Sequence, residues 1–413
     1  MQFPPVPLST RLPSESRTGR KRVGGSYPRA VNMAFVAVAA CGGDSGSGFD
    51  ADGPGAQDAD VPRLPNCESG APWEMERTGA GGYWSAMAAT EEGEVHVVYL
   101  GSSGVGHAWR AAGVWQTEVV ASDVDTFVYG KPGIAVAADS VHIAFSDGGV
   151  LMHGRKAGGS WSTAVADGDT MNIEHVALAA DEAGGVHASY TGLVPNPVGV
   201  GYDQHLFHAY LAPAGGWTLA QATGPLYGNT SDGWLGYSSV AARASGVAHV
   251  ALRDDYASIG YATNSSGTWF HALVDDDRAF TAPSLAIDAL GSVHIAFFDV
   301  TPNEVRYVRL DPFQHEEVAD SYDSRSGGED LTSIAVDAAG EVHVVFGVAT
   351  DVAGGGQLRY ARGPGSWSSE AIDGERTGFS AAVVVDGSGQ IHVTYIRVAD
   401  EASTGVIYAR PCP

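Results

Sequence analysis

The chain has 413 residues, 48 of them acidic and 23 basic, which gives a formal net charge of −25 at pH 7. This charge disfavours nucleic acid as a partner, because no basic patch offsets the repulsion. The 55 glycines and the small charged fraction of 17% suit a chain of many short strands joined by tight turns.

The first 41 residues have the pattern of an export signal. A basic stretch at 17–29 precedes an apolar run at 30–40, which is much too short to span a bilayer. The run ends in Val38-Ala-Ala-Cys41, which resembles a bacterial lipobox. The resemblance implies cleavage before Cys41, diacylation of that cysteine and, from Gly42, release to the outer membrane. The alternative is an irregular N-terminus with a chance match.

Residues 42–65 form the next segment, which consists of glycine, aspartate, serine, alanine and proline with almost nothing apolar. Such a composition cannot bury enough surface to fold, so the segment is predicted to be a disordered tether. It would hold the domain at 66–413 clear of the membrane surface.

Four short strands in a row are predicted between residues 333 and 373. The segments 333–337, 342–346 and 358–362 alternate or are rich in β-branched residues, and Trp367 opens the fourth. Turn residues separate the segments, and no apolar period of 3.6 residues extends over a helical length. One such meander cannot bury its faces alone, so copies of it must stack.

The unit recurs seven times along the chain. A histidine in the second strand returns at spacings of 45–49 residues, with one spacing of 62: His96, His142, His187, His249, His294, His343 and His392. The third strand carries a ring each time: His107, His153, His208, Tyr261, Tyr307, Tyr360 and Tyr408. The fourth strand opens with an aromatic residue six times: Trp115, Trp161, Trp217, Trp269, Phe313 and Trp367.

Six fourth strands for seven repeats leave one blade without its fourth strand, and this strand is predicted at the N-terminal end of the domain. The segment 71–78 resembles the other fourth strands, with Trp73 in the tryptophan position. An N-terminal strand that completes the last blade closes a β-propeller and removes its open sheet edges. The predicted fold is therefore all-β, a seven-bladed β-propeller of four-stranded antiparallel blades closed by this strand.

Three cysteines are an odd number for an exported protein. Lipidation of Cys41 leaves Cys67, just before the closing strand, and Cys412, close to the C-terminus. The two chain ends are neighbours in a closed ring, so a Cys67–Cys412 disulfide is predicted. It requires an oxidising compartment.

The recurring histidines and rings are interpreted as structural. Residues that occupy one strand position on separate blades lie too far apart to share an ion, and a neutral imidazole that bonds a neighbouring strand or turn is the simpler role. Exchange of histidine for tyrosine also preserves a packed ring with a polar tip, but not a metal ligand. No metal and no cofactor is therefore expected.

Function is expected where the sevenfold pattern breaks. The loops between strands two and three, and the links between blades, emerge on one face of a propeller. The long departures from the pattern are of these two kinds, at 191–204, 223–236, 347–357 and 397–405. The candidate binding residues are Tyr202, Asp203, Tyr227, Asn229, Asp232, Trp234, Asp254, Asp255, Tyr256 and Asp299. Aromatic faces beside carboxylates and amides suit sugars or a protein loop; the alternative is a set of solvated loops.

The repeats, with their G-x-[VI]-H pattern and tryptophan-led fourth strands, resemble the sialidase-like, BNR-type propellers and the seven-bladed bacterial sugar-binding lectins over about 340 residues. The sialidase signature S-x-D-x-G-x-T-W is absent, and 267–269 is its nearest fragment. A sialidase also needs an arginine triad. Four arginines occupy one periodic position in strand three and are interpreted as structural: Arg155, Arg309, Arg362 and Arg410.

Two functions from different classes follow. The preferred one is a monomeric outer-membrane lipoprotein, facing the periplasm or the cell exterior, whose non-catalytic propeller binds a glycan or protein. The alternative is a glycan-processing enzyme that uses carboxylates such as Asp254, Asp255 and Asp299. A calcium-dependent module is the poorer third option, because acids are present but no D-x-D-x-D-G loop is.

Overall fold

The computed structural model describes residues 64–82, 84–125, 130–197, 201–226, 237–255, 258–275, 282–299, 304–320, 332–349, 356–374, 377–397 and 405–413. By its contacts the chain divides into Met1–Val61 and Pro62–Pro413, and all described residues belong to the second unit. The predictions for the signal, for lipidated Cys41 and for nearly all of the tether therefore lie outside the described residues.

Seven four-stranded antiparallel sheets make up the domain. Blade 1 contains β2 (Trp84–Ala89), β3 (Val95–Gly101), β4 (Gly104–Ala111) and β5 (Val114–Ser122). Blade 2 contains β6 (Gly133–Ala137), β7 (Ser140–Asp147), β8 (Val150–Ala157) and β9 (Ser160–Asp167). Blade 3 contains β10 (Met171–Ala180), β11 (Val186–Pro195), β12 (Tyr202–Leu211) and β13 (Trp217–Gln221). Blade 4 contains β14 (Ser238–Ala242), β15 (Ala248–Asp255), β16 (Ser258–Thr263) and β17 (Phe270–Asp275).

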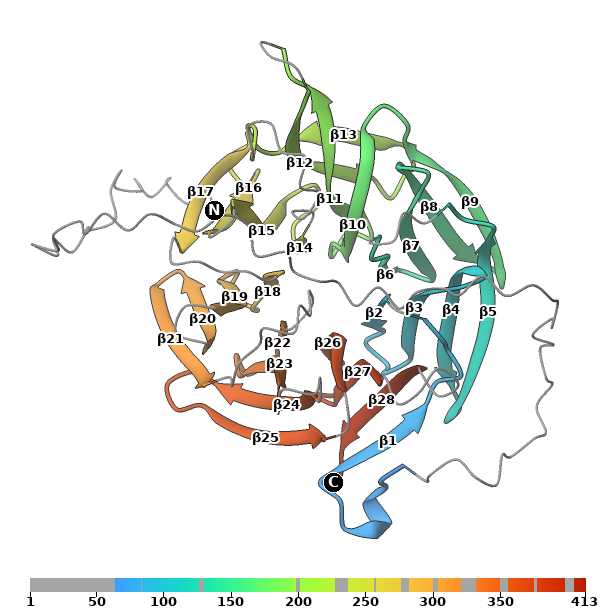
Figure 1. Ribbon diagram of the computed structural model, residues 1–413, viewed down its shortest axis with the longest axis vertical. Helices are drawn as coiled ribbons and strands as arrows, with labels where there is room; N and C mark the ends of the chain where they lie inside the picture. Colours follow the sequence, from blue (N-terminus) through green and yellow to red (C-terminus); the bar gives the residue numbers. More distant parts are fainter. Residues whose placement is uncertain are drawn as a thin grey trace, which may run out of the picture. The chain divides into compact units, whose positions relative to one another are not determined.

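The remaining blades follow the same order. Blade 5 contains β18 (Ser284–Ile287), β19 (Val293–Asp299), β20 (Glu304–Leu310) and β21 (Phe313–Asp320). Blade 6 contains β22 (Thr332–Val336), β23 (Val342–Ala349), β24 (Gly356–Gly363) and β25 (Ser368–Asp373). Blade 7 contains β26 (Thr377–Val385), β27 (Ile391–Arg397), β28 (Gly405–Pro411) and β1 (Trp73–Arg77). The seven sheets stand around a ring with the first strand of each blade nearest the centre (Figure 1), so the predicted propeller is confirmed.

Both ends of the domain meet in blade 7. Strand β1 pairs antiparallel with β28, in a register that sets Trp73 opposite Pro411 and Arg77 opposite Ile407. A short 3₁₀ turn, η1 (Cys67–Ser69), precedes β1. Cys67 in this turn forms a disulfide with Cys412 across a Cα–Cα distance of 5.4 Å, as predicted.

The loops between strands two and three are shorter than the sequence suggested. The hairpin of β11 and β12 stays paired up to Pro195 opposite Tyr202, inside the segment assigned to a loop at 191–204. In blade 6, β23 and β24 stay paired up to Ala349 opposite Gly356. Each added residue pair satisfies backbone N–H and C=O groups, which favours extension of the ladder as far as the turn.

The hydrophobic core is divided among the blade junctions. The described buried residues form seven apolar clusters, and each combines side chains from two neighbouring blades. Between blades 5 and 6, for example, Phe298 and Val305 pack with Val344 and Phe346. Each blade therefore has both of its faces covered by its neighbours.

The recurring histidines pair with the recurring rings within each blade. The Nδ1 atom of the second-strand histidine lies 2.6–3.1 Å from a polar atom of the third-strand ring in all seven blades. The pairs are His96–His107, His142–His153, His187–His208, His249–Tyr261, His294–Tyr307, His343–Tyr360 and His392–Tyr408. Such packed and hydrogen-bonded rings have the structural role expected of them.

The fourth-strand tryptophans join neighbouring blades. Trp367, for example, meets the Tyr307 ring of blade 5 edge-on at 5.3 Å between centroids, and its Nε1 donates to Glu316 Oε2 at 2.8 Å. Equivalent indole-to-glutamate bonds are Trp73–Glu370, Trp115–Glu76 and Trp161–Glu118. Blades 2, 3 and 4 carry Ala164, Ala220 and Ala272 where the others carry this glutamate.

We expect Glu316→Ala to lower the free energy of unfolding by about 1–3 kcal/mol, because it leaves the Trp367 N–H without its charged acceptor. Urea unfolding of Glu316→Ala, Trp367→Phe and the double variant measures the coupling. The fold should survive, since three blades already have alanine there. Additive single-variant effects would contradict a direct contribution from this bond.

We also expect the domain to lose stability between pH 6.5 and pH 4. Burial, together with neighbouring cations and imidazoles, lowers the pKa of His96, His107, His142, His153 and His249 from 6.5 to about 4. The unfolded chain therefore binds more protons than the folded chain in this window. The contribution of these histidines to the free energy of unfolding is fully present above pH 6.5 and decreases as the pH falls. Denaturant midpoints measured across the window test this.

The matched variant is His153→Tyr, which gives blade 2 the His–Tyr pair of blades 4 to 7. A buried phenol does not titrate in this window, so the variant should lose less stability between pH 6.5 and 4 than the parent. An equal loss would rule out His153 as one of the responsible groups.

Candidate functional site

Four of the 14 histidines lie outside the periodic positions. Seven belong to the second strands and three to the third strands, which leaves His175, His205, His271 and His315. These four are absent from the predicted binding residues, although their departure from the repeat was a readable signal in the sequence. The structure places them in blades 3, 4 and 5.

A narrow cavity of about 150 Å³ lies on the axis of the ring, lined by the first strands of all seven blades. Small side chains occupy equivalent lining positions: Ala86, Gly133, Ala177, Ser239, Ser284, Ser333 and Ala382. At Gly133, an added Cβ would lie 2.8 Å from both Leu178 N and Val176 O, so a larger residue cannot fit there. Convergence of seven strands at the axis explains these small residues.

Serine hydroxyls connect consecutive blades around this cavity. Ser239 accepts the backbone N–H of Leu285, Ser284 accepts that of Ile334, and Ser333 accepts that of Val383, at 3.0–3.1 Å. The wall from blade 4 to blade 7 is thereby tied together. Each of these serine oxygens therefore has a structural role as a hydrogen-bond acceptor.

Four larger residues lie near one end of the cavity. Three of them lie at, or one or two residues before, the N-terminal end of a first strand, and the fourth, His175, lies within β10. Tyr237 directly precedes β14, and its ring lies 4.0 Å from that of His175 between centroids. Trp84, at the start of β2, meets His175 edge-on at 5.6 Å. Lys131, two residues before β6, also lines the cavity. The rings of Trp84, His175 and Tyr237 thus gather at this end of the cavity, where Lys131 also contributes to the lining. His175 and Tyr237 are buried, with 5% and 4% of their surface exposed.

The backbone of β10 is irregular where it presents His175. The register of β10 against β11 shifts on both sides of Glu174. Asn172 and His175 have φ angles of 49° and 36°, in the left-handed region that non-glycine residues rarely adopt. The φ at His175 is held by the surrounding structure, and such departures concentrate at functional sites.

A charged cluster forms a second feature of the same face, between blades 4 and 5. The Arg306 guanidinium Nε lies 3.1 Å from Asp299 Oδ2, and its Nη1 lies 3.9 Å from Asp275 Oδ2. His315 Nε2 lies 3.6 Å from the same Asp275 oxygen. Asp299 is fully buried, so an arginine is required beside it.

The structure places five of the ten predicted binding residues, with side-chain detail for four. Tyr202 opens β12 and is 46% exposed, which leaves its ring accessible. Asp203 is buried and accepts the Asn196 side-chain N–H at 3.0 Å, so it stabilises the hairpin. Asp254 Oδ2 lies 3.2 Å from His271 Nε2, and Asp255 ends β15 opposite Ser258.

The other five predicted binding residues lie outside the described residues: Tyr227, Asn229, Asp232, Trp234 and Tyr256. Asp203, Asp254 and Asp299 belong to three different blades, and each has a partner close to it. Asp299 was singled out from the sequence, whereas its partners Asp275, Arg306 and His315 were not. The structure brings these four together from two blades.

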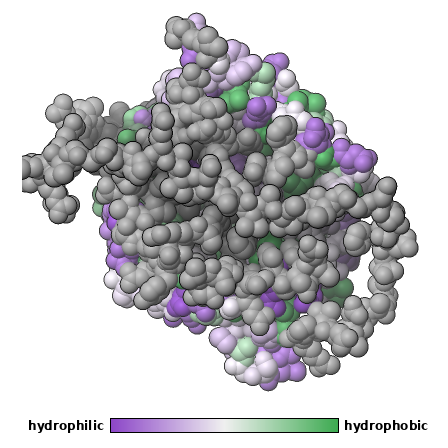
Figure 2. Space-filling view, in the orientation of Figure 1, coloured by the Kyte–Doolittle hydropathy of each residue, from purple (hydrophilic) through white to green (hydrophobic). Residues whose placement is uncertain are grey.

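Coloured side chains at the visible margin of the domain include both hydrophilic and hydrophobic residues (Figure 2). Exposed apolar residues occur singly on the outer strands, among them Val114, Val165, Leu219 and Phe313. Scattered exposure of this kind is normal for soluble surfaces. Among the described residues, no helix has the length and apolar character needed to cross a membrane.

No protein-family model and no curated protein matches the chain. Solved propellers are similar in structure. An ulvan lyase of polysaccharide lyase family PL25 has a TM-score of 0.54 and 11% identity, with 80% of this chain and 94% of that chain covered. An α-L-arabinanase from Penicillium chrysogenum has a TM-score of 0.45 and 10% identity, with 81% and 94% covered. The Aleuria aurantia lectin has a TM-score of 0.46 and 10% identity, with 70% and 95% covered.

At 11% identity the similarity to the ulvan lyase supports the propeller fold and nothing finer. The number of blades comes from the seven sheets of this chain. A shared fold does not define a function, because function depends on the site that a scaffold carries. The function of this chain must therefore be inferred from the groups on the face that bears the loops.

Proposed function

We propose that this protein is an outer-membrane lipoprotein whose propeller binds a glycan on the face that bears the inter-blade links and the strand 2–3 loops. The observation that carries the proposal is the axial cavity, whose lining includes Lys131 and the buried rings of His175 and Tyr237, residues that the sevenfold repeat does not require. Trp84 packs edge-on against His175 behind this lining. The exposed ring of Tyr202 belongs to the same face.

The chemistry of these groups suits a sugar ligand. Aromatic faces pack against the apolar faces of sugar rings, and ammonium and imidazole groups bind hydroxyl or acid substituents. The cavity itself, at about 150 Å³, has room for only part of a saccharide. A longer glycan would therefore lie across the rim and insert one substituent at the axis.

Binding by a non-catalytic module is the favoured form of the proposal. The described acids of the face, including Asp203, Asp254 and Asp299, each have a partner nearby. Asp275 and Asp299, both buried and both near Arg306, favour a second candidate, a glycan-processing enzyme. Buried carboxylates on a ligand-binding face are the groups that glycosidic chemistry uses.

Glycan-array and calorimetric measurements with neutral and acidic glycans test the binding proposal. Trp84→Ala and Tyr202→Ala should each weaken binding of the selected glycan by about tenfold or more, because each removes one aromatic contact. A tenfold change corresponds to about 1.4 kcal/mol of binding free energy. Leu290→Ala is the matched control, because Leu290 is 88% exposed on a strand 1–2 turn at the opposite face.

Three results discriminate between the functions. If the Leu290→Ala variant still binds the glycan and the Trp84→Ala and Tyr202→Ala variants do not, the glycan-binding module is supported. If the parent protein produces new reducing or unsaturated ends on a glycan, and the folded Asp299→Asn variant produces none, the glycan-processing enzyme is favoured. A protein that binds no glycan contradicts both and leaves a protein ligand as the partner.

The membrane anchor is proposed from the sequence of residues 38–42 and has its own test. Expressed in a Gram-negative host with radiolabelled palmitate, the parent chain should incorporate label and partition into detergent. Cys41→Ser should do neither, because the acylated thiol is absent. Cys67→Ser should keep the label, and a labelled Cys41→Ser variant would refute this anchor.

A further inference from the structure

The turn between the first and second strands contains a recurring aspartate–histidine contact. In blades 3, 5 and 7 the turn aspartates Asp181, Asp288 and Asp386 each accept two or more backbone N–H groups through Oδ1. The other carboxylate oxygen lies 3.1–3.2 Å from Nε2 of the second-strand histidine. Both histidine nitrogens and both aspartate oxygens are therefore satisfied.

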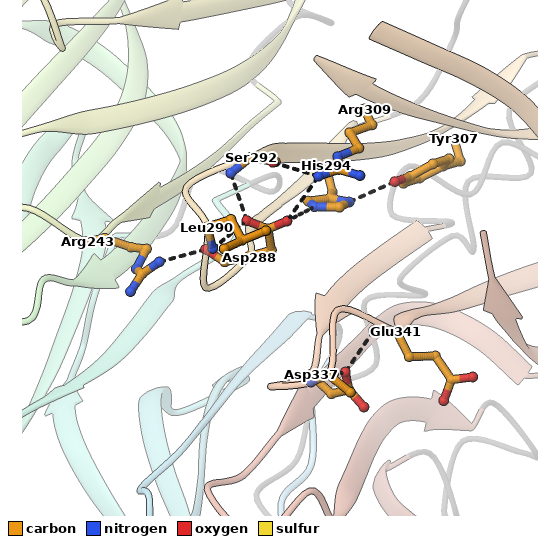
Figure 3. A network of polar contacts seen from close by, with 10 residues as sticks. Arg243, Asp288, Leu290, Ser292, His294, Tyr307, Arg309, Asp337 and Glu341 are labelled. Carbon is orange, nitrogen blue, oxygen red and sulfur yellow. Dashed lines mark hydrogen bonds and ion pairs between the residues drawn. The ribbon is translucent and has the colours of Figure 1, made fainter. Parts of the chain in front are cut away.

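Blade 5 shows how the charge of such a turn is balanced (Figure 3). Asp288 contacts His294, and Arg309 Nη2 lies 3.5 Å from Asp288 Oδ2. Ser292 donates its backbone N–H to Asp288 and accepts from Arg309 through its hydroxyl. One carboxylate is thus matched by one guanidinium.

The turn of blade 6 departs from this arrangement. Asp337 Oδ1 accepts the N–H groups of Ala339 and Glu341 as usual, but Asp337 Oδ2 lies 3.8 Å from His343 Nε2, too far for a hydrogen bond. Glu341 occupies the position that Ser292 has in blade 5, and Asp337 and Glu341 lie side by side on the turn (Figure 3). No described residue forms an ion pair with either carboxylate apart from His343.

The histidine of this turn is buried with one nitrogen unused. His343 is only 3% exposed, and its Nε2 has no hydrogen-bond partner among the described residues. Its Nδ1 lies 2.7 Å from the Tyr360 hydroxyl, which fixes the orientation of the ring. Nε2 and one carboxylate oxygen each from Asp337 and Glu341 lie within 4.8 Å of one another.

We propose that Asp337, Glu341 and His343 bind a divalent transition-metal ion of the zinc type. One imidazole and two carboxylates are a ligand set that Zn²⁺ accepts, whereas Ca²⁺ and Mg²⁺ prefer oxygen alone. With metal–ligand bonds of about 2.0–2.1 Å, the ligand atoms of a tetrahedral site lie about 3.3 Å apart. A small rotation of the Asp337 and Glu341 side chains would therefore bring their oxygens and His343 Nε2 to this separation. The Tyr360 hydroxyl would accept a hydrogen bond from His343 Nδ1–H and thereby orient the imidazole that binds the metal.

This site departs from the expectation of no metal, because His343 retains its structural contact through Nδ1 and still offers Nε2. It lies at the end of the blade opposite to the strand 2–3 loops, so it is independent of the proposed glycan site. Three protein ligands leave a fourth position for water or for a group from another molecule. Arg362, at the position of Arg309, adds a positive charge that would lower the affinity.

The test uses the full chain, produced without a histidine tag, titrated with ZnCl₂ by calorimetry and with Co²⁺ by visible absorption. The parent should bind one equivalent of Zn²⁺ and melt at a higher temperature in its presence. Glu341→Gln and Asp337→Asn should each weaken Zn²⁺ by about tenfold or more, since removing even an outer partner of a metal ligand costs about 10–100-fold. Asparagine can still accept the turn N–H groups, which preserves the fold.

The matched control is Glu94→Gln in blade 1. Glu94 precedes His96 as Glu341 precedes His343, but Thr90 replaces the aspartate, so this change should leave Zn²⁺ affinity unaltered. The proposal is overturned if the parent binds no Zn²⁺, or if Glu341→Gln binds it as tightly as the parent. It is also overturned if Glu94→Gln weakens binding equally, because that result would report general attraction to an acidic surface.

Discussion

Burial of each blade against its neighbours is the constraint on which the rest of the structure depends. Every described apolar cluster spans a junction between two blades, so a single sheet has no core of its own. A ring satisfies both faces of every sheet without leaving an end. Blade 7 takes its outer strand β1 from the N-terminal side of the domain, and the Cys67–Cys412 bond ties the two ends together.

This constraint explains why so many polar residues of the repeat are unavailable for function. The second-strand histidines are engaged with third-strand rings, and six of those seven rings pack against a tryptophan of the next blade. The tryptophans in turn donate to glutamates at four junctions. A group that carries a ligand must therefore either lie outside the repeat, as His175 does, or keep one atom unused, as His343 does.

The ring also separates two chemical environments. The end of each blade that bears the strand 2–3 loops carries the aromatic rim of the axial cavity and the Asp275–Asp299–Arg306 cluster. The opposite end carries the turn aspartates and their histidines. Between them lies the narrow axial cavity, lined by residues as small as Gly133.

The sequence by itself determined the repeat, and with it the strands, the number of blades and the pairing of Cys67 with Cys412. These features follow from short-range alternation and from a fixed period, both of which are properties of the chain alone. It also identified Tyr202, in a break of the pattern, and Asp299, an acid at the end of a second strand, as candidate binding residues. Only the tertiary structure decided which breaks meet: His175 with Tyr237 and Trp84 from three blades, and Asp299 with Arg306 and Asp275 from two.

Distances between blades, and the separation of His343 Nε2 from Asp337 Oδ2, depend on ring curvature and on side-chain packing at each junction. A one-dimensional pattern does not encode them, because it records which residue occupies a position and not how far that position lies from the next sheet. The extended β11–β12 hairpin is a similar case, since its paired ends depended on ladder hydrogen bonds rather than on turn composition.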